Sequence, residues 1–237
     1  MKLIRTTIIT VLTLIIIIGV CGCMDRNSNK SNRQESEQEY LVLMQSYIEE
    51  KYSITVDVLE YIFPQDGINT ALKENVLVVR DSKGVISNVK ARLSSPYSFY
   101  DDYVAACTAQ SIQDELEISV PHGVAKIYVV TNNLDINQLD TSSTNISSLT
   151  FVSTISGNPT DEAMKILYEI YDKLQKRYEN VYFLVGFTDG SDEFKKATEN
   201  YMVYGKSEWK DYSGEVYAEL YVTDKNLSFD EFKDNVK

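Results

Sequence analysis

The order of the expected elements is the feature that most constrains how this chain folds. Segments rich in β-branched and aromatic residues cluster around single amphipathic helices and do not alternate one for one with them. This grouping is typical of α+β folds and disfavours a doubly wound parallel sheet. We therefore expect an α+β fold with antiparallel sheets and packed helices. The strand candidates are residues 54–63, 75–80, 85–92, 124–131, 149–155, 180–188, 200–206 and 214–223.

Apolar residues at helical spacing indicate the helices. The clearest helix covers residues 159–179, and others cover 40–52, a stretch after Pro96, and 228–236, where Ser228 and Glu231 form a capping-box pattern. Two segments are alike: YIEEKYSITVDVLEY and YDKLQKRYENVYFLVGF, each followed by two further strand candidates. Two related α-β-β-β subdomains would explain this likeness, and two unrelated αβ segments are the alternative.

Composition divides the chain into parts. Residues 132–148 are polar and poor in large apolar side chains, which predicts a linker between an α+β subdomain at 40–131 and a second at 149–237. Residues 25–39 contain no aliphatic or aromatic residue, so they have nothing to bury and are expected to be disordered.

The N-terminus has the pattern of an export signal. Lys2 and Arg5 precede an uncharged apolar run, Ile8–Val20, and the chain becomes polar at Asp25. A basic start, an apolar run of this length and small residues after it predict a secretory signal peptide. The alternative is an uncleaved membrane helix, although the run is shorter than the roughly 20 residues that a spanning helix needs.

The end of this signal resembles the lipobox of bacterial lipoproteins. Val20, Cys21 and Gly22 stand in the three positions before Cys23. The resemblance implies removal of residues 1–22 and attachment of acyl chains such as palmitate to Cys23, with residues 23–39 as a tether. It therefore implies a protein held at the outer, extracytoplasmic face of the cell membrane through the lipid on Cys23. Low cysteine use favours a Gram-positive source.

The charge balance limits the partners. The formal net charge is -12, and loss of Lys2 and Arg5 with the signal makes the remaining chain more acidic. An acidic protein is not expected to bind nucleic acid, because both are negatively charged. Cationic peptides, metal cations or a basic protein remain compatible partners. Cys107 would be the one cysteine left without a lipid, which excludes an intrachain disulfide.

Catalytic and cofactor motifs are missing from the sequence. His122 is the single histidine, which excludes a zinc site built on two histidines. Cys107 and His122 would make a nucleophile pair only if the fold joined them, and Cys107 lies on the apolar face of its expected helix, where a buried thiol is usual. Neither GxSxG nor GxGxxG occurs. We expect no catalytic residues, no metal and no cofactor.

Aromatic residues give the candidate binding site. Tyr204, Trp209 and Tyr212 fall within a predicted hairpin formed by residues 200–206 and 214–223. Tyrosine and tryptophan are enriched at interfaces, so these three are the candidate partner-binding residues. Cross-strand packing within the sheet is the alternative.

These features predict a non-catalytic, membrane-anchored lipoprotein that binds a protein or peptide partner at the cell surface. A sensor, a transporter or a secreted protease would suit that location. The alternative is a carboxylate-dependent hydrolase of cell-wall or extracellular substrates, since acidic residues are plentiful. A solute-binding protein is a third hypothesis, which the chain length and the lack of alternating βαβ units disfavour.

Overall fold

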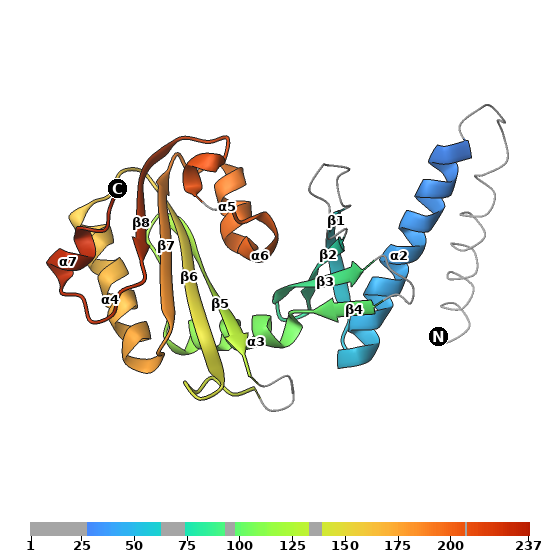
Figure 1. Cartoon of the computed structure of the whole chain (residues 1–237), viewed down its shortest axis with the longest axis horizontal. Coiled ribbons are helices and arrows are strands. Elements are labelled where there is room, and N and C mark those ends of the chain that lie inside the picture. Colours follow the sequence, from blue (N-terminus) through green and yellow to red (C-terminus); the bar gives the residue numbers. More distant parts are fainter. Residues whose placement is uncertain (1–27, 63–73, 93–97, 133–138, 207) are drawn as a thin grey trace, which may run out of the picture. The chain divides into compact units, whose positions relative to one another are not determined.

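Two four-stranded sheets follow one another along the chain (Figure 1). Their strand orders are β1-β2-β3-β4 and β5-β6-β7-β8, and helices pack against both. The expected α+β class is confirmed. The computed structural model describes residues 28–62, 74–92, 98–132, 139–206 and 208–237.

Most predicted elements are present, with shifted ends. The strands are β1 (Val56–Ile62), β2 (Glu74–Asp81), β3 (Ile86–Arg92), β4 (Ser98–Asp101), β5 (Gly123–Thr131), β6 (Ile146–Ser156), β7 (Val181–Thr188) and β8 (Val216–Val222). The helices are α2 (Ser28–Tyr52), α3 (Tyr103–Glu115), α4 (Asp161–Arg177), α5 (Asp192–Glu199), α6 (Tyr201–Tyr204), the 3-10 helix η2 (Trp209–Asp211) and α7 (Phe229–Lys233). The predicted capping box at α7 is confirmed, because Ser228 and Glu231 exchange both hydrogen bonds.

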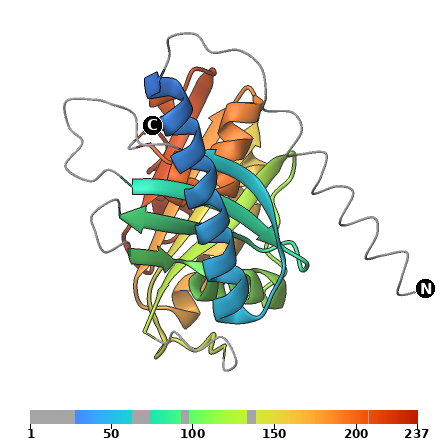
Figure 2. The same cartoon turned by 90° about the vertical axis from the view of Figure 1, so that its right-hand side faces the viewer.

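The first sheet is an antiparallel meander. A tight turn joins β2 to β3: the Asp81 carboxylate accepts the N–H groups of Lys83 and Val85, and Gly84 has a φ of 84°. That positive φ favours glycine. From Leu41 onward, α2 lies across one face of this sheet, where Met44 is fully buried (Figure 2).

Helix α2 begins earlier than expected, at Ser28. Residues 28–39 of the segment predicted to be a disordered tether are therefore helical, and residues 23–27 lie outside the described residues. The segment 25–39 contains neither proline nor glycine, so a helix extending back from Tyr40 meets no strong breaker. Residues 41–237 form one compact unit, and the described residues before Leu41 belong to a separate one.

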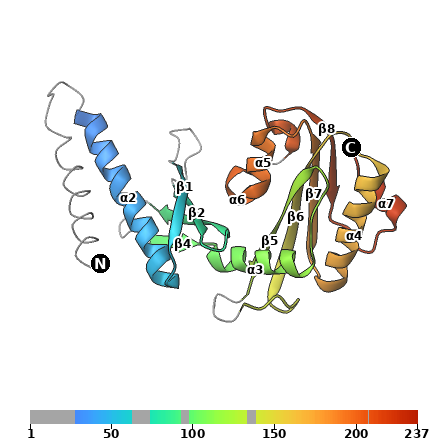
Figure 3. The same ribbon diagram turned by 180° about the vertical axis from the view of Figure 1, so that it is seen from behind.

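The second sheet is mixed, because β6 and β7 are parallel while its other pairs are antiparallel. The parallel pair arises because α4 connects these two strands as a crossover. Helices α4 and α7 cover one face, and α5, α6 and η2 cover the other (Figure 3). Phe151 and Phe183 stack at a centroid distance of 4.2 Å within the core on the α4 side.

The two sheets are connected by α3 and not by residues 132–148. Cys107 of α3 belongs to the core of the first sheet, and Ile112, further along the same helix, belongs to the core of the second. The described parts of the predicted linker join β5 to β6, which are neighbours in one sheet. The predicted linker therefore falls between two paired strands of the second sheet and not between the two sheets.

The predicted strand over residues 200–206 is wrong, because Tyr201–Tyr204 form the short helix α6. Tyrosine and valine favour strands in isolation, but here Tyr201 packs beside the ring of Trp209, and this tertiary contact overrides the local preference. Helices therefore stand between β7 and β8, so the second α-β-β-β unit of the expected repeat does not form.

Candidate functional site

Trp209 and Tyr212, two of the three predicted binding residues, lie inside the protein. Their side chains are 4% and 6% exposed, and both pack against Phe194 of α5. The Trp209 ring also lies so close to Gly186 of β7 that a Cβ there would be 3.0 Å from it. These residues fix η2 and α5 to the sheet by core packing. They do not form the exposed hairpin surface that the sequence predicts.

Tyr204, the third predicted residue, is half-buried and joins two distant parts of the chain. Its hydroxyl donates to the carboxylate of Glu60 on β1. Lys196 lies over the Tyr204 ring, 4.3 Å from its centroid, with its Nζ 2.7 Å from Glu60 Oε2. Hydrogen bonding to Lys196, then to Tyr204, holds the pKa of Glu60 below its usual value. Tyr204 therefore links the first sheet to α6.

Among the described contacts, no hydrogen bond joins Cys107 to His122, the two residues of the hypothetical nucleophile pair. Cys107 is buried as expected, within the core of the first sheet, and this burial raises the pKa of its thiol. His122 is exposed, directly before β5. A buried thiol with a raised pKa lacks the thiolate character that a nucleophile needs.

A groove runs along β5, between α3 on one side and the α5–α6 junction on the other. The empty space in it is about 590 Å³, which includes the part that is open to solvent. The start of β3 and the start of α3 close it. We call it the β5 groove, and it is lined by Val85, Ile86, Asn88, Asp102, Ala105, Ala106, Ala109, Gln110, Gln113, Lys126, Ile127, Tyr128, Val129, Glu199, Asn200 and Met202.

The free edge of β5 forms one wall of this groove. Among the described strands, β5 lies at the edge of its sheet and pairs with β6 alone. The backbone N–H of Leu149 in β6 donates to the backbone C=O of Asn180, just before β7, at 2.8 Å. Leu149 and every second residue after it in β6 therefore point their backbone groups toward β7. The residues of β6 between them bond to β5, so Ile127 and Val129 direct their N–H and C=O groups away from β6.

A side-chain contact confirms this orientation. The C=O of Ala125, two residues before Ile127, accepts the Nε2–H of Gln113 on α3 at 3.0 Å. Ala125 therefore points its carbonyl outward, as Ile127 and Val129 do. For the backbone groups of Ile127 and Val129 no such partner exists in the described part of the chain. The groove thus offers unpaired backbone donors and acceptors beside apolar side chains.

Asp102 brings a carboxylate to the closed end of the groove. Its Oδ1 accepts the Asn88 N–H at 2.6 Å, and its Oδ2 accepts the Asn88 Nδ2–H at 2.7 Å. Burial raises the pKa of this carboxyl group despite both hydrogen bonds. Among the described residues, no ion pair with a lysine or arginine compensates Asp102. The site therefore has a half-buried carboxylate without an ion-paired cation among the described residues.

Two contacts hold the walls of the groove together. The side-chain amides of Asn88 and Asn200 bond to each other, at 2.7 Å and 3.2 Å, which ties β3 to the α5–α6 junction. The Tyr128 hydroxyl donates to the Thr198 carbonyl at 2.6 Å and accepts the Tyr201 N–H at 2.9 Å. The α5–α6 junction is therefore fastened to β5 beside the groove.

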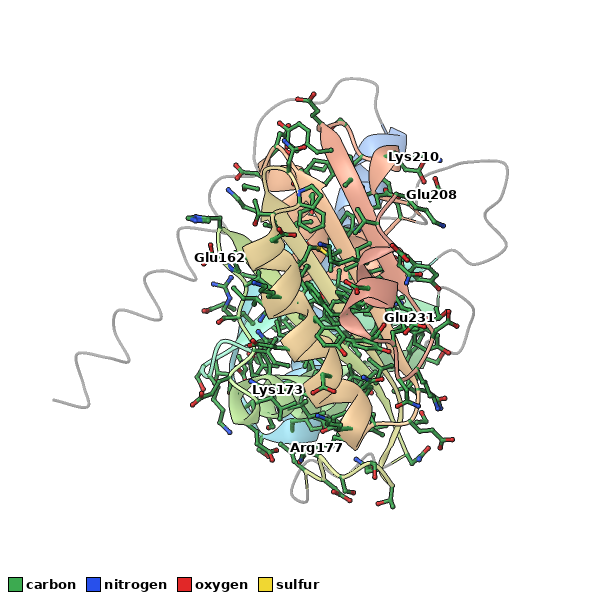
Figure 4. All side chains as sticks on the ribbon, turned by 90° about the vertical axis from the view of Figure 1, so that its left-hand side faces the viewer. Glu162, Lys173, Arg177, Glu208, Lys210 and Glu231 are labelled. Atoms are coloured by element: carbon green, nitrogen blue, oxygen red, sulfur yellow. The ribbon has the colours of Figure 1, made fainter. Side chains whose placement is uncertain are left out.

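Other surfaces carry less distinctive chemistry. Figure 4 shows charged side chains, including Lys173 and Arg177 of α4, on the outer side of α4 and α7, and Arg177 pairs with Glu115 at 2.7 Å. A second pocket of about 340 Å³ lies at the ends of β6 and β7, and it includes Lys195 but no carboxylate.

Within the described ranges, no three His, Cys, Asp or Glu side chains gather as metal ligands. None of the described helices has both the length and the apolar character to cross a membrane.

Sequence reasoning missed the β5 groove. Residues 124–131 are recognisable as a strand, but no local signal says that one edge of it stays unpaired. Asp102 follows Asp101 in the sequence, and nothing in that pair indicates that the two carboxylates enter different surroundings. The single charged residue, Lys126, within the mostly apolar strand VAKIYVVT is the sequence feature that points to an incompletely covered strand.

Comparison with known proteins finds a distant structural similarity. No protein-family model matches the chain, and no curated protein matches it. The crystal structure of a DUF5037 family protein from Ruminococcus gnavus ATCC 29149 is similar, with a TM-score of 0.49 and 13% sequence identity. The match covers 83% of this chain and 98% of that one.

Proposed function

We propose that this protein is an extracytoplasmic lipoprotein, anchored through Cys23, that binds a protein or peptide partner in the β5 groove. The groove carries the proposal, because it combines an apolar lining with unpaired backbone groups on Ile127 and Val129. A polypeptide partner supplies matching backbone donors and acceptors. The lipobox-type sequence before Cys23 supports the anchor, although Cys23 lies outside the described residues.

Charge supports a partner that is not itself acidic. The chain has a formal net charge of -12, and Asp102 and Glu199 both line the groove. Lys126 is the one lysine in the lining, and its Nζ lies 3.4 Å from the Gln110 side-chain oxygen. Electrostatic attraction at the outer membrane face would therefore favour a basic or neutral segment.

A carboxylate-dependent hydrolase is the second candidate, because Asp102 and Glu199 line the same groove and the pKa of Asp102 is raised by burial. A raised pKa suits a general acid. Against this role, both oxygens of Asp102 already accept hydrogen bonds from Asn88, which favours a fixed acceptor over a proton donor to a substrate. Binding is therefore the better-supported function.

Photo-crosslinking in the native host tests the binding function. Met202 lines the groove and is 54% exposed, so a photoreactive amino acid at this position should form an adduct with the partner. The matched control is Tyr217 on β8, which is 41% exposed and does not line the groove. We expect an adduct of defined mass from position 202 and none from position 217.

The anchor is tested in the same cells. The Cys23→Ala variant should lose incorporation of an alkyne-labelled palmitate, keep its signal segment, and give no position-202 adduct. Full labelling of Cys23→Ala would contradict the lipoprotein assignment. Equal adducts from positions 202 and 217, or none from 202, would contradict the groove as the binding site. Unchanged adduct formation with Asp102→Asn but release of cleaved substrate only by the wild type would favour the hydrolase.

A further inference from the structure

The free edge of β5 defines the conformation that fits the groove. Ile127 and Val129 present backbone groups two residues apart, all directed into the groove. An extended segment also directs its backbone groups to one side at every second residue, so its groups match those of the β5 edge. Paired strands lie about 4.8 Å apart. A helical segment has no free backbone groups to offer to this edge, because its own hydrogen bonds use them.

The walls provide separate surfaces for alternating side chains. The small residues Ala105, Ala106 and Ala109 of α3 leave room on one side of the β5 edge, and Met202 and Tyr128 stand on the other. An added strand directs successive side chains toward α3 and toward α5–α6 in turn. Apolar or β-branched side chains suit both walls.

Asp102 adds a charge requirement at the closed end. Its carboxylate is held by Asn88 and has no cationic partner among the described residues. A half-buried carboxylate without a paired cation has lost part of its hydration, and an ammonium or guanidinium group from a bound segment would compensate this charge. Lys90 and Lys126 are the nearby cations: Lys90 acts on Asp102 only through longer-range attraction, and Lys126 contacts Gln110.

Resting on the binding function proposed above, we propose that the β5 groove receives an extended, basic peptide segment that pairs with the edge of β5 and directs a lysine or arginine side chain to Asp102. The recognition is β-strand addition, in which main-chain hydrogen bonds supply affinity and a side-chain site supplies specificity. The segment belongs to the partner and has alternating apolar residues around one basic residue.

Selection of peptides tests this proposal without a known partner. Random heptapeptides displayed on phage are selected against the full-length lipidated chain in nanodiscs. Peptides enriched on the wild type should share one Lys or Arg position and β-branched residues two positions away. Asp102→Asn should bind the resynthesised peptide at least about 10-fold more weakly, the size of a lost charge-assisted hydrogen bond. Glu199→Gln is the matched control and should change affinity by less than about 2-fold, since Glu199 is exposed.

A proline variant tests the backbone pairing. Val129→Pro removes the N–H that points away from β6, so it blocks strand addition and leaves the β5–β6 hydrogen bonds in place. Val129→Ala is its matched control, because it also loses the valine side chain but keeps the N–H. Of these two variants, Val129→Pro should lose peptide binding and Val129→Ala should keep it. Hydrogen exchange gives a direct measurement: the resynthesised peptide should slow exchange of the Ile127 and Val129 amides about 10-fold or more.

Several results would overturn the proposal. The first is a selection in which no peptide is enriched on the wild type relative to Val129→Pro. The second is equal peptide binding by Val129→Pro and Val129→Ala. The third is a set of enriched peptides that lack a basic residue. If these occur while the position-202 adduct still forms in cells, the partner binds by another mode and the binding function stands. If the adduct is also absent, both proposals fail. Urea unfolding of each variant is the control that tests whether its fold is intact.

Discussion

The two sheets of this protein are stabilised by different chemistry. The second sheet is covered on both faces, and its core contains Phe151, Phe183, Phe187 and Tyr171, all nearly or fully buried. The core of the first sheet is smaller and mostly aliphatic, with Met44, Ile48 and Leu77 fully buried. Apolar burial therefore supplies a larger share of the stability in the second sheet.

The first sheet depends in addition on a buried carboxylate. Asp101, whose side chain is 1% exposed, accepts hydrogen bonds from the hydroxyls of Tyr47 and Tyr52, at 2.9 and 2.8 Å, and from Lys51 at 2.7 Å. These donors come from α2, so Asp101 joins this helix to β4. Asp102, the next residue, lines the β5 groove, and its carboxylate accepts hydrogen bonds from the uncharged Asn88.

The largest expected effect is in the aromatic core of the second sheet. Phe183→Ala removes one ring of the pair stacked at 4.2 Å and leaves a cavity beside Tyr171 and Phe232. We expect a loss of about 3–5 kcal/mol in the free energy of unfolding, measured by urea titration. A loss below about 1 kcal/mol would show that the second sheet does not depend on this packing.

The second effect tests the carboxylate of the first sheet. Asp101→Asn keeps the shape of the side chain but weakens the hydrogen bonds from Lys51, Tyr47 and Tyr52. We expect a loss of about 2 kcal/mol, since hydrogen bonds to charged groups contribute about 1.5–3 kcal/mol. Asp102→Asn is the matched control and should cost less, because Asp102 has no cationic partner among the described residues. Equal losses would remove the contrast between the neighbouring carboxylates.

The same carboxylate predicts a dependence on pH. Burial alone would raise the pKa of Asp101, but the hydrogen bonds from Lys51, Tyr52 and Tyr47 outweigh it and hold this pKa below its usual 3.8. A lowered folded-state pKa contributes stability above the unfolded-state pKa, and that contribution is lost as pH falls through the folded-state value. Between about pH 5 and 2, wild type should therefore lose more stability than Asp101→Asn. Parallel stability curves would contradict this assignment.

The smallest expected effect concerns the link between the first sheet and α6. Tyr204→Phe removes the hydroxyl that donates to Glu60 and keeps the ring beneath Lys196. We expect a loss of about 1 kcal/mol, because the carboxylate still has Lys196 as a partner. Tyr221→Phe, at an exposed tyrosine on β8, is the control and should change stability very little. An effect above about 3 kcal/mol would mean that this link supports the whole fold.

Periodicity and composition alone were sufficient for much of the local structure. The pattern from Met164 to Leu174 predicts α4 and its buried face, and Ser228 with Glu231 predicts the cap of α7, because both signals lie within a few residues. The α+β class follows from the grouping of strands. Cys107 was expected to be buried from its position on an apolar helix face, and it is.

Tertiary structure decided the features that join distant residues. Tyr201–Tyr204 have strand-favouring side chains but form a helix packed on Trp209. Of the three aromatic residues predicted to form a binding surface, Trp209 and Tyr212 are buried and Tyr204 is half-buried. Asp101 and Asp102 are the same residue type in adjacent positions, but their pKa values shift in opposite directions: burial dominates at Asp102, and the hydrogen bonds from Lys51, Tyr52 and Tyr47 outweigh burial at Asp101. The unpaired edge of β5 is likewise invisible in VAKIYVVT, because whether a strand lies at an edge depends on which strands pair beside it.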